Sequence, residues 1–167
     1  MLPRLSLFAV GLLLIGGLAA CNGEAPEEPN DVEAFDPDTP TTELTIRTVD
    51  DQMLYADERF TVPAGEEITL RLDNSGTTSP AMLHNVVILN TMDGDVIDRV
   101  GEAGLEVGPP DYVPDDDAII AYSPMADPGE IVEMTFTAPE EPGEYRYICT
   151  YPGHYGVMQG TMVVVES

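Results

Sequence analysis

A cysteine, a histidine and a methionine stand close together near the end of this 167-residue chain. Four residues separate Cys149 from His154, and three separate His154 from Met158. The only other histidine, His84, stands just before a short apolar run. A thiolate, two imidazoles and a thioether are the ligands of a trigonal copper site with a long axial methionine, whereas zinc more often takes four close ligands without a thioether. These four residues therefore predict a single copper site.

Each of these residues has an ordinary structural explanation when it is taken alone. A lone cysteine is most often a small buried apolar residue, and a lone methionine most often fills space in a core. A cysteine–histidine hydrolase uses the same residue types but gives Met158 no role. A copper oxidase or nitrite reductase needs more histidines than the two in this chain. We therefore expect a copper site and no enzyme.

Short apolar runs that could position this site begin at residue 44. Several of them alternate apolar and polar residues, which is the pattern of half-buried strands. We predict an all-β sandwich or barrel of antiparallel strands, with a short helix or an irregular flap at about residues 92–108. The expected strands cover residues 44–49, 68–72, 86–89, 118–122, 131–137, 145–149 and 161–165.

The order of these strands determines where the predicted ligands lie. One strand is expected to end at Cys149, and the next is expected to begin at Thr161. The loop between them must return on itself, so it presents Cys149, His154 and Met158 at one end of the domain. The run 86–89 is apolar throughout, as in a strand buried on both faces.

The loop 149–158, with sequence CTYPGHYGVM, resembles the ligand loop of the type 1 copper, or cupredoxin, family in its azurin and auracyanin class. The segment 82–85 resembles the first-ligand segment of that family, and residues 111–116 resemble a loop before the next strand. The similarity covers roughly residues 44–167. It implies a cupredoxin-like Greek-key β-sandwich or barrel. It also implies that His84, Cys149 and His154 are equatorial copper ligands and that Met158 is the weak axial ligand.

The same resemblance implies roles for residues beside the ligands. Asn85 matches an asparagine that joins the two ligand loops near the cysteine sulfur, and we group Thr150 with it. Leu83 stands where azurins usually have a glycine whose carbonyl approaches copper, so we do not count that contact. Met82, Pro152 and Tyr155 are candidates for an apolar docking patch around the second histidine ligand.

The first twenty residues read as a secretory signal, because a charged start precedes an apolar run too short to favour a membrane-spanning helix. Residues 18–21, LAAC, resemble a bacterial lipobox, which implies a lipid anchor on Cys21. An uncleaved membrane anchor is the alternative. Residues 21–43 carry eight acidic residues, four prolines and no base, which predicts a disordered tether ahead of a domain over 44–167.

The chain is strongly acidic. Acidic residues outnumber basic ones 31 to 6, lysine is absent, and the formal charge is −25. This charge argues against binding nucleic acid, whose phosphates require positive side chains. It could steer a basic redox partner or reflect adaptation to high salt. We favour salt adaptation, because the acidic residues are spread over both tether and domain.

Together these features predict an exported electron carrier, anchored to a membrane through Cys21 and facing the periplasm or cell exterior. Its copper would cycle between Cu(I) and Cu(II) while it shuttles between redox proteins of a membrane electron-transport chain. We expect a monomer. The alternatives are a copper-storage or copper-delivery lipoprotein and a metal-free adhesion module.

Overall fold

The computed structural model describes residues 36–166. The predicted signal peptide, the predicted lipidation site Cys21 and residues 21–35 of the predicted tether lie outside this range. The described end of the predicted tether contacts the domain. The Thr61 hydroxyl donates to the Pro37 carbonyl at 2.7 Å, and the Thr41 amide donates to the Thr61 carbonyl at 3.0 Å. Defined contacts therefore begin ahead of residue 44.

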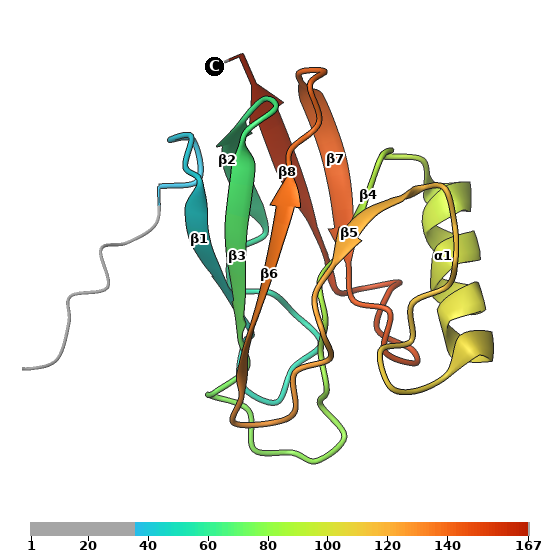
Figure 1. The fold of residues 1–167 in the computed structure, drawn as a ribbon. Coiled ribbons are helices and arrows are strands. Elements are labelled where there is room, and N and C mark those ends of the chain that lie inside the picture. Colours follow the sequence, from blue (N-terminus) through green and yellow to red (C-terminus); the bar gives the residue numbers. More distant parts are fainter. Residues whose placement is uncertain (1–35, 167) are drawn as a thin grey trace, which may run out of the picture. The chain divides into compact units, whose positions relative to one another are not determined.

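The described chain forms eight strands and one helix (Figure 1). In chain order the elements are β1 (Glu43–Arg47), β2 (Arg59–Pro63), β3 (Glu67–Asp73), β4 (Val87–Leu89), α1 (Gly94–Val107), β5 (Ile119–Tyr122), β6 (Ile131–Thr137), β7 (Gly143–Ile148) and β8 (Gln159–Val165).

The strands form two sheets that enclose one core (Figure 1). A three-stranded sheet has the order β1-β3-β6, and a five-stranded sheet has the order β2-β8-β7-β4-β5. Ile46 and Leu70 from the first sheet share a buried cluster with Phe60 and Val164 from the second. The two sheets remain separate and do not close into a barrel. The predicted sandwich is thus confirmed, and the barrel alternative is not formed.

Two details of the pairing differ from the expectation of an antiparallel fold. Strand β1 pairs with β3 in parallel, and β2 pairs with β8 in parallel. In addition, β2 is a strand that the sequence pattern did not predict. It has only five residues and ends in Pro63, so its local pattern is weak. Pairing with the seven-residue β8 supplies the hydrogen bonds that define it.

The segment predicted as a short helix or flap is the helix α1. It begins after Asp93, whose side chain accepts a hydrogen bond from the Asp95 amide at 2.9 Å and so caps the first turn. It ends at Gly108, where a φ of 75° takes the chain out of the helix. The buried face comprises Ile97, Val100, Gly101 and Gly104.

This helix covers the outer face of the five-stranded sheet, away from the three-stranded sheet (Figure 1). Val87 and Leu89 of β4 belong to the same buried cluster as Val100 of α1. Ile88, between them, points into the core of the sandwich. Strand β4 is therefore buried on both faces, as its continuous apolar run predicted.

Candidate metal centre

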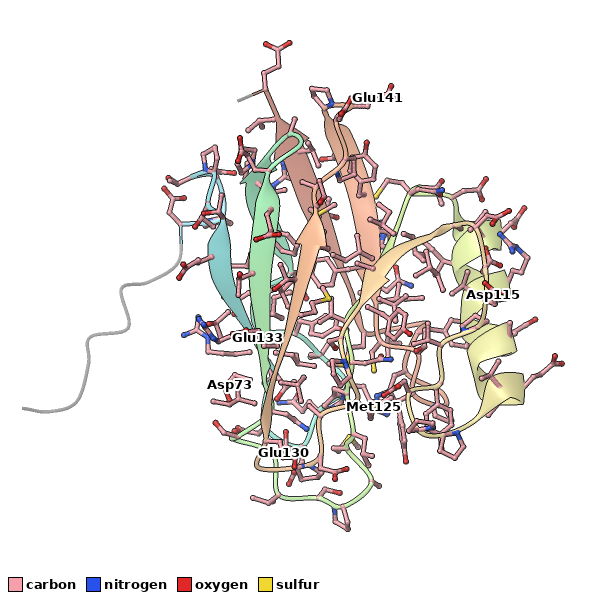
Figure 2. All side chains as sticks on the ribbon, in the orientation of Figure 1. Asp73, Asp115, Met125, Glu130, Glu133 and Glu141 are labelled. Atoms are coloured by element: carbon pink, nitrogen blue, oxygen red, sulfur yellow. The ribbon has the colours of Figure 1, made fainter. Side chains whose placement is uncertain are left out.

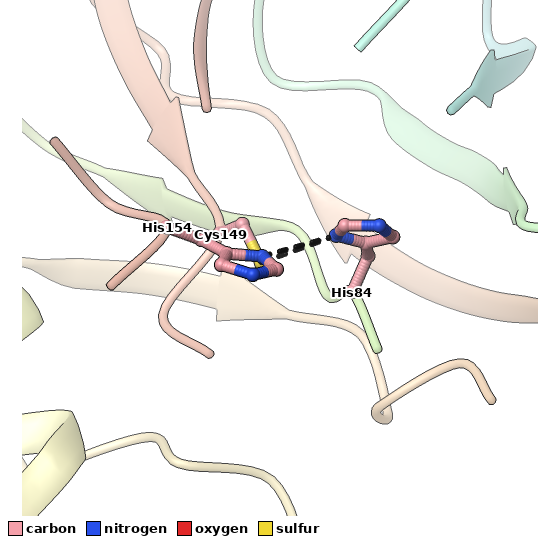
Figure 3. A group of neighbouring side chains, drawn as sticks. All are labelled: His84, Cys149 and His154. Carbon is pink, nitrogen blue, oxygen red and sulfur yellow. Dashed lines mark hydrogen bonds between the residues drawn. The ribbon is translucent and has the colours of Figure 1, made fainter. Parts of the chain in front are cut away.

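Three of the predicted ligands come together from separate parts of the chain (Figure 3). His84 lies just before β4, where its backbone pairs with Ala126. Cys149 follows β7, and His154 lies in the loop before β8. The Cys149 Sγ is 3.8 Å from Nδ1 of His84 and 3.6 Å from Nδ1 of His154, and the two Nδ1 atoms are 3.3 Å apart.

The size of this triangle fits a metal ion. Metal–nitrogen and metal–sulfur bonds of about 2.0–2.3 Å place ligand atoms about 3.3–3.8 Å apart in trigonal or tetrahedral geometry. The three measured separations fall in this range. Nε2 of His84 is buried without a hydrogen-bond partner among the described residues. The polar contacts of that ring are therefore made by Nδ1, which faces the other two ligand atoms. Soft sulfur with two imidazole nitrogens suits copper.

The electrostatics of the buried site also suit a cation. Burial raises the pKa of the Cys149 thiol to about 12, against an opposing effect of hydrogen bonds from the Asn85 and Tyr151 amides. Burial and the neighbouring His154 lower the pKa of His84 to about 4, and burial lowers the pKa of His154. Both rings are thus neutral ligands near neutral pH. A metal ion that binds here displaces the thiol proton.

The fourth predicted ligand, Met158, closes the loop. Its side chain is fully buried in the same cluster as Cys149. The Met158 amide donates to the His154 carbonyl at 2.8 Å, and the Cys149 amide donates to the Met158 carbonyl at 3.1 Å. The second bond joins the two ends of the loop, so the sulfur-bearing residues Cys149 and Met158 are neighbours.

Hydrogen bonds from Asn85 join three segments around the site. Its side-chain carbonyl accepts from the Thr150 amide at 2.9 Å, and its amide donates to the Thr150 hydroxyl at 2.8 Å. The same amide also donates to the Asp111 carbonyl at 2.9 Å. The segment that carries His84 is thus tied to the loop that begins at Cys149, and both are tied to the loop after α1.

Sequence reasoning missed several aromatic residues around the centre. The Tyr55 hydroxyl donates to the backbone carbonyl of Asn85 at 2.6 Å. The Tyr151 ring meets His154 edge-on with centroids 4.9 Å apart, and Tyr112 meets Tyr151 in the same manner at 5.4 Å. Only Tyr151 had a usable signal, since it lies between two predicted ligands. The others reach the site through tertiary contacts.

The predicted apolar patch is only partly assembled as expected. Met82 lines a shallow, mostly apolar depression together with Met53, Leu54 and Val157, and Asp51 and Gln52 also line it. Pro152 is half-buried. Tyr155 is also half-buried, and its ring packs against Gly101 of α1. Apolar side chains close in sequence to His84 and Met158 therefore line one depression, and Met82 is the predicted patch residue among them.

Comparisons with known proteins agree with this geometry. The profile of the copper binding proteins, plastocyanin/azurin family, matches residues 42–165. Auracyanin-A of Chloroflexus aurantiacus is 36% identical over 163 residues, which are 96% of each chain. Outer membrane protein H.8 of Neisseria meningitidis serogroup B is 33% identical over 127 residues, which are 73% of this chain and 67% of the relative.

A solved structure of dithionite-reduced auracyanin from Roseiflexus castenholzii has a TM-score of 0.70 and 40% identity, and the match covers 76% of this chain and 99% of that one. Within residues 36–166, no helix has the length and apolar character needed to cross a membrane. The fold, the cysteine–histidine cluster and these similarities lead to one conclusion. This chain belongs to the copper-binding plastocyanin/azurin family, and it is a blue copper protein that takes one type 1 copper ion.

Proposed function

We propose that this protein is a lipid-anchored electron carrier outside the cytoplasm, with copper held by His84, Cys149, His154 and, more weakly, Met158. The observation that carries the proposal is the convergence of one sulfur and two nitrogen atoms within 4.8 Å of one another in a buried pocket. Similarity to auracyanins supports it, since auracyanin A of Chloroflexus aurantiacus is described as a blue copper protein.

Bound copper supplies a one-electron couple between Cu(II) and Cu(I). The protein's contribution is to hold its ligands in one arrangement for both oxidation states. Amide hydrogen bonds from Asn85 and Tyr151 to the sulfur favour the thiolate. The hydrogen bonds across the loop and through Asn85 resist movement of the ligands. Since the ligand atoms are buried, water and substrates are kept from the metal, which suits electron transfer and not catalysis.

Electrons enter and leave through His154 in this proposal. His154 is 3% exposed, so it lies nearer the surface than His84 and Cys149, which are fully buried. The apolar depression of Met53, Leu54, Met82 and Val157 offers a neighbouring surface for a redox protein. Of the predicted patch residues, Met82 lines this depression, whereas the Tyr155 ring packs against Gly101 of α1.

The membrane anchor is proposed from the sequence around Cys21. Similarity to a relative named as an outer membrane protein supports a position at a membrane, outside the cytoplasm. The partners would be redox proteins of a membrane electron-transport chain, visited by a monomer on its tether. A storage or delivery protein needs an exchangeable metal site, so the burial of the ligands favours the carrier over that alternative.

The test is the visible spectrum of the full-length protein loaded with Cu(II). We expect an intense thiolate-to-copper absorption that disappears on reduction and returns on oxidation. Cys149→Ser should abolish it. Cys21→Ser, which changes the other cysteine, should keep the colour but release the protein from membranes. A colourless wild-type protein, or colour that survives Cys149→Ser, would contradict the copper assignment, and membrane retention of Cys21→Ser would contradict the anchor.

A further inference from the structure

Two glycines on the buried face of α1 lie against the loop that carries the copper ligands. Gly101 and Gly104 are one turn apart, and both are buried. Figure 1 shows the loop between β7 and β8 beside this helix. A β-carbon at either position would overlap with atoms of the loops around the metal centre. At these two positions the helix and the loops are therefore so close that not even a methyl side chain fits between them.

Gly101 packs against Tyr155, the residue that follows the second histidine ligand, His154. A β-carbon built on Gly101 would overlap with Cγ, Cδ1 and Cδ2 of Tyr155. Cγ is the ring atom nearest the Tyr155 backbone, so rotation of the ring about its own axis cannot relieve the overlap. The ring must swing away or the backbone beside His154 must move.

Gly104 lies against the Tyr112 carbonyl, in the loop after α1, and beside Thr150, the residue that follows the cysteine ligand. Its β-carbon would overlap with the Tyr112 carbonyl oxygen and would lie 3.3 Å from Cβ of Thr150. Thr150 is the residue whose amide and hydroxyl are both bonded to the Asn85 side chain. A side chain at Gly104 would therefore displace Thr150 and disturb its hydrogen bonds to Asn85, which join the two ligand segments.

We propose that Gly101 and Gly104 are positioning residues for the copper centre. These two positions form a side-chain-free surface on α1, and the packing of Tyr155 and Thr150 against that surface fixes where the two residues lie. Through these two residues, the helix sets the places of His154 and Cys149. The inference rests on the proposed function, since it concerns the same ligands. It assigns to α1 a role in tuning the metal, in addition to covering the sheet.

Helix propensity alone gives the opposite expectation, which makes the proposal testable. Alanine is a better helix former than glycine, so replacing a helical glycine normally stabilises a protein. Gly94 supplies the matched control in the same helix, because nothing lies within 4 Å of a β-carbon built there. Gly94→Ala should leave the metal centre unchanged.

The experiment compares wild type, Gly101→Ala and Gly94→Ala as full-length proteins in three measurements. These are the visible and electron paramagnetic resonance spectra with Cu(II), the reduction potential, and amide hydrogen exchange of the metal-free protein. In Gly101→Ala we expect a changed spectrum, a shifted potential and at least tenfold faster exchange at the His154 and Met158 amides, which donate to the Tyr151 and His154 carbonyls within the loop. Gly94→Ala should match wild type in all three.

A merely structural role for Gly101 would lower the melting temperature but leave spectrum, potential and loop exchange as in wild type, and that result would overturn the proposal. If wild type takes up no copper, the proposed function fails, and the exchange measurement on the metal-free protein still tests the positioning of the loop.

A double variant removes the ambiguity of misfolding. Tyr155→Ala takes away the ring that the new β-carbon would meet, so adding Gly101→Ala to it should change the spectrum and loop exchange little further. If Gly101→Ala alone does not fold, the double variant should fold and bind copper as Tyr155→Ala does. Failure of the double variant alone, or a full additional shift in it, would show that Tyr155 is not the point of contact and would overturn the proposal.

Discussion

At the scale of single residues, Asn85 links three segments through its buried side chain. We predict that Asn85→Ala destabilises the metal-free protein by about 2–4 kcal/mol, because each buried partner left without a hydrogen bond costs about 1–3 kcal/mol. Urea unfolding measures this change. Asn90→Ala is the control, since the Asn90 side chain donates only to the Asp117 carbonyl, at an exposed position. Equal losses in the two variants would mean that Asn85 is not a structural link.

Met158 offers a second test at this scale, which concerns the metal. Met158→Leu conserves the buried apolar volume but removes the axial ligand, which tunes the potential of blue copper sites. Loss of an electron-pair donor destabilises Cu(II), the more highly charged ion, more than Cu(I). We expect a protein that still binds copper, with a reduction potential higher by about 60 mV or more, which corresponds to tenfold for one electron. Met134→Leu, in the buried core of β6, is the matched control and should leave the potential unchanged. Equal potentials in all three proteins would exclude Met158 as a ligand.

At the scale of elements, strand β7 carries a buried tyrosine that makes stability depend on alkaline pH. The Tyr147 hydroxyl donates to the Asp57 carbonyl, and burial, with the nearby Asp57 and Glu58 charges, raises its pKa. A raised pKa in the folded state means that stability is complete below pH about 10 and is lost as the pH rises above it. The metal-free protein should therefore unfold at progressively lower urea concentration above pH 10.

Substitution at this tyrosine should flatten the alkaline profile. Tyr147→Phe loses one hydrogen bond, so we expect about 1 kcal/mol less stability at pH 7 and a shallower decline above pH 10. The midpoints of urea unfolding between pH 7 and 11 give the comparison. Tyr122→Phe, at a half-exposed position on β5, should retain the wild-type profile. A Tyr147→Phe profile parallel to wild type would assign the decline to other groups.

At the scale of the whole molecule, the dominant feature is negative charge without a single acidic face. Figure 2 shows Glu141 near one end of the domain, Glu130 near the other, and Asp115 beside the helix. Like charges spread in this manner repel within the folded state and are screened by salt. We predict that the melting temperature of the metal-free protein rises by about 5 °C or more between 0.1 and 1 M NaCl, equivalent to about 1 kcal/mol.

A variant with fewer exposed charges provides the control for this prediction. Asp115→Asn, Glu106→Gln and Glu141→Gln combined should melt higher at low salt and gain less from added NaCl. Thermal unfolding followed by circular dichroism measures both quantities. A melting temperature that falls with salt would mean that ion pairs such as Arg71–Glu133, at 2.9 Å, outweigh the repulsion.

The residue order by itself determined the chemistry of the site and the class of fold. Cys149, His154 and Met158 lie within ten residues, so one loop must keep them together and their spacing could be recognised directly. Alternation likewise revealed most strands, because side-chain direction along a strand is a local property. Asn85 could be placed beside the ligands for a similar reason, since it follows His84 in the chain.

The tertiary structure decided what depends on contacts between distant segments. Strand pairing is one such feature, because the alternation of residues within a strand does not reveal its partner. Pairing decides that β1 and β2 have parallel partners, that β2 forms at all, and that the two sheets stay separate. Tyr155 fitted an exposed patch by its position in the loop, yet its ring packs on Gly101, which is 54 positions earlier in the chain. The glycines at positions 101 and 104 could be linked to the metal centre only once the fold placed the ligand loop against α1, because close packing depends on which surfaces meet in space.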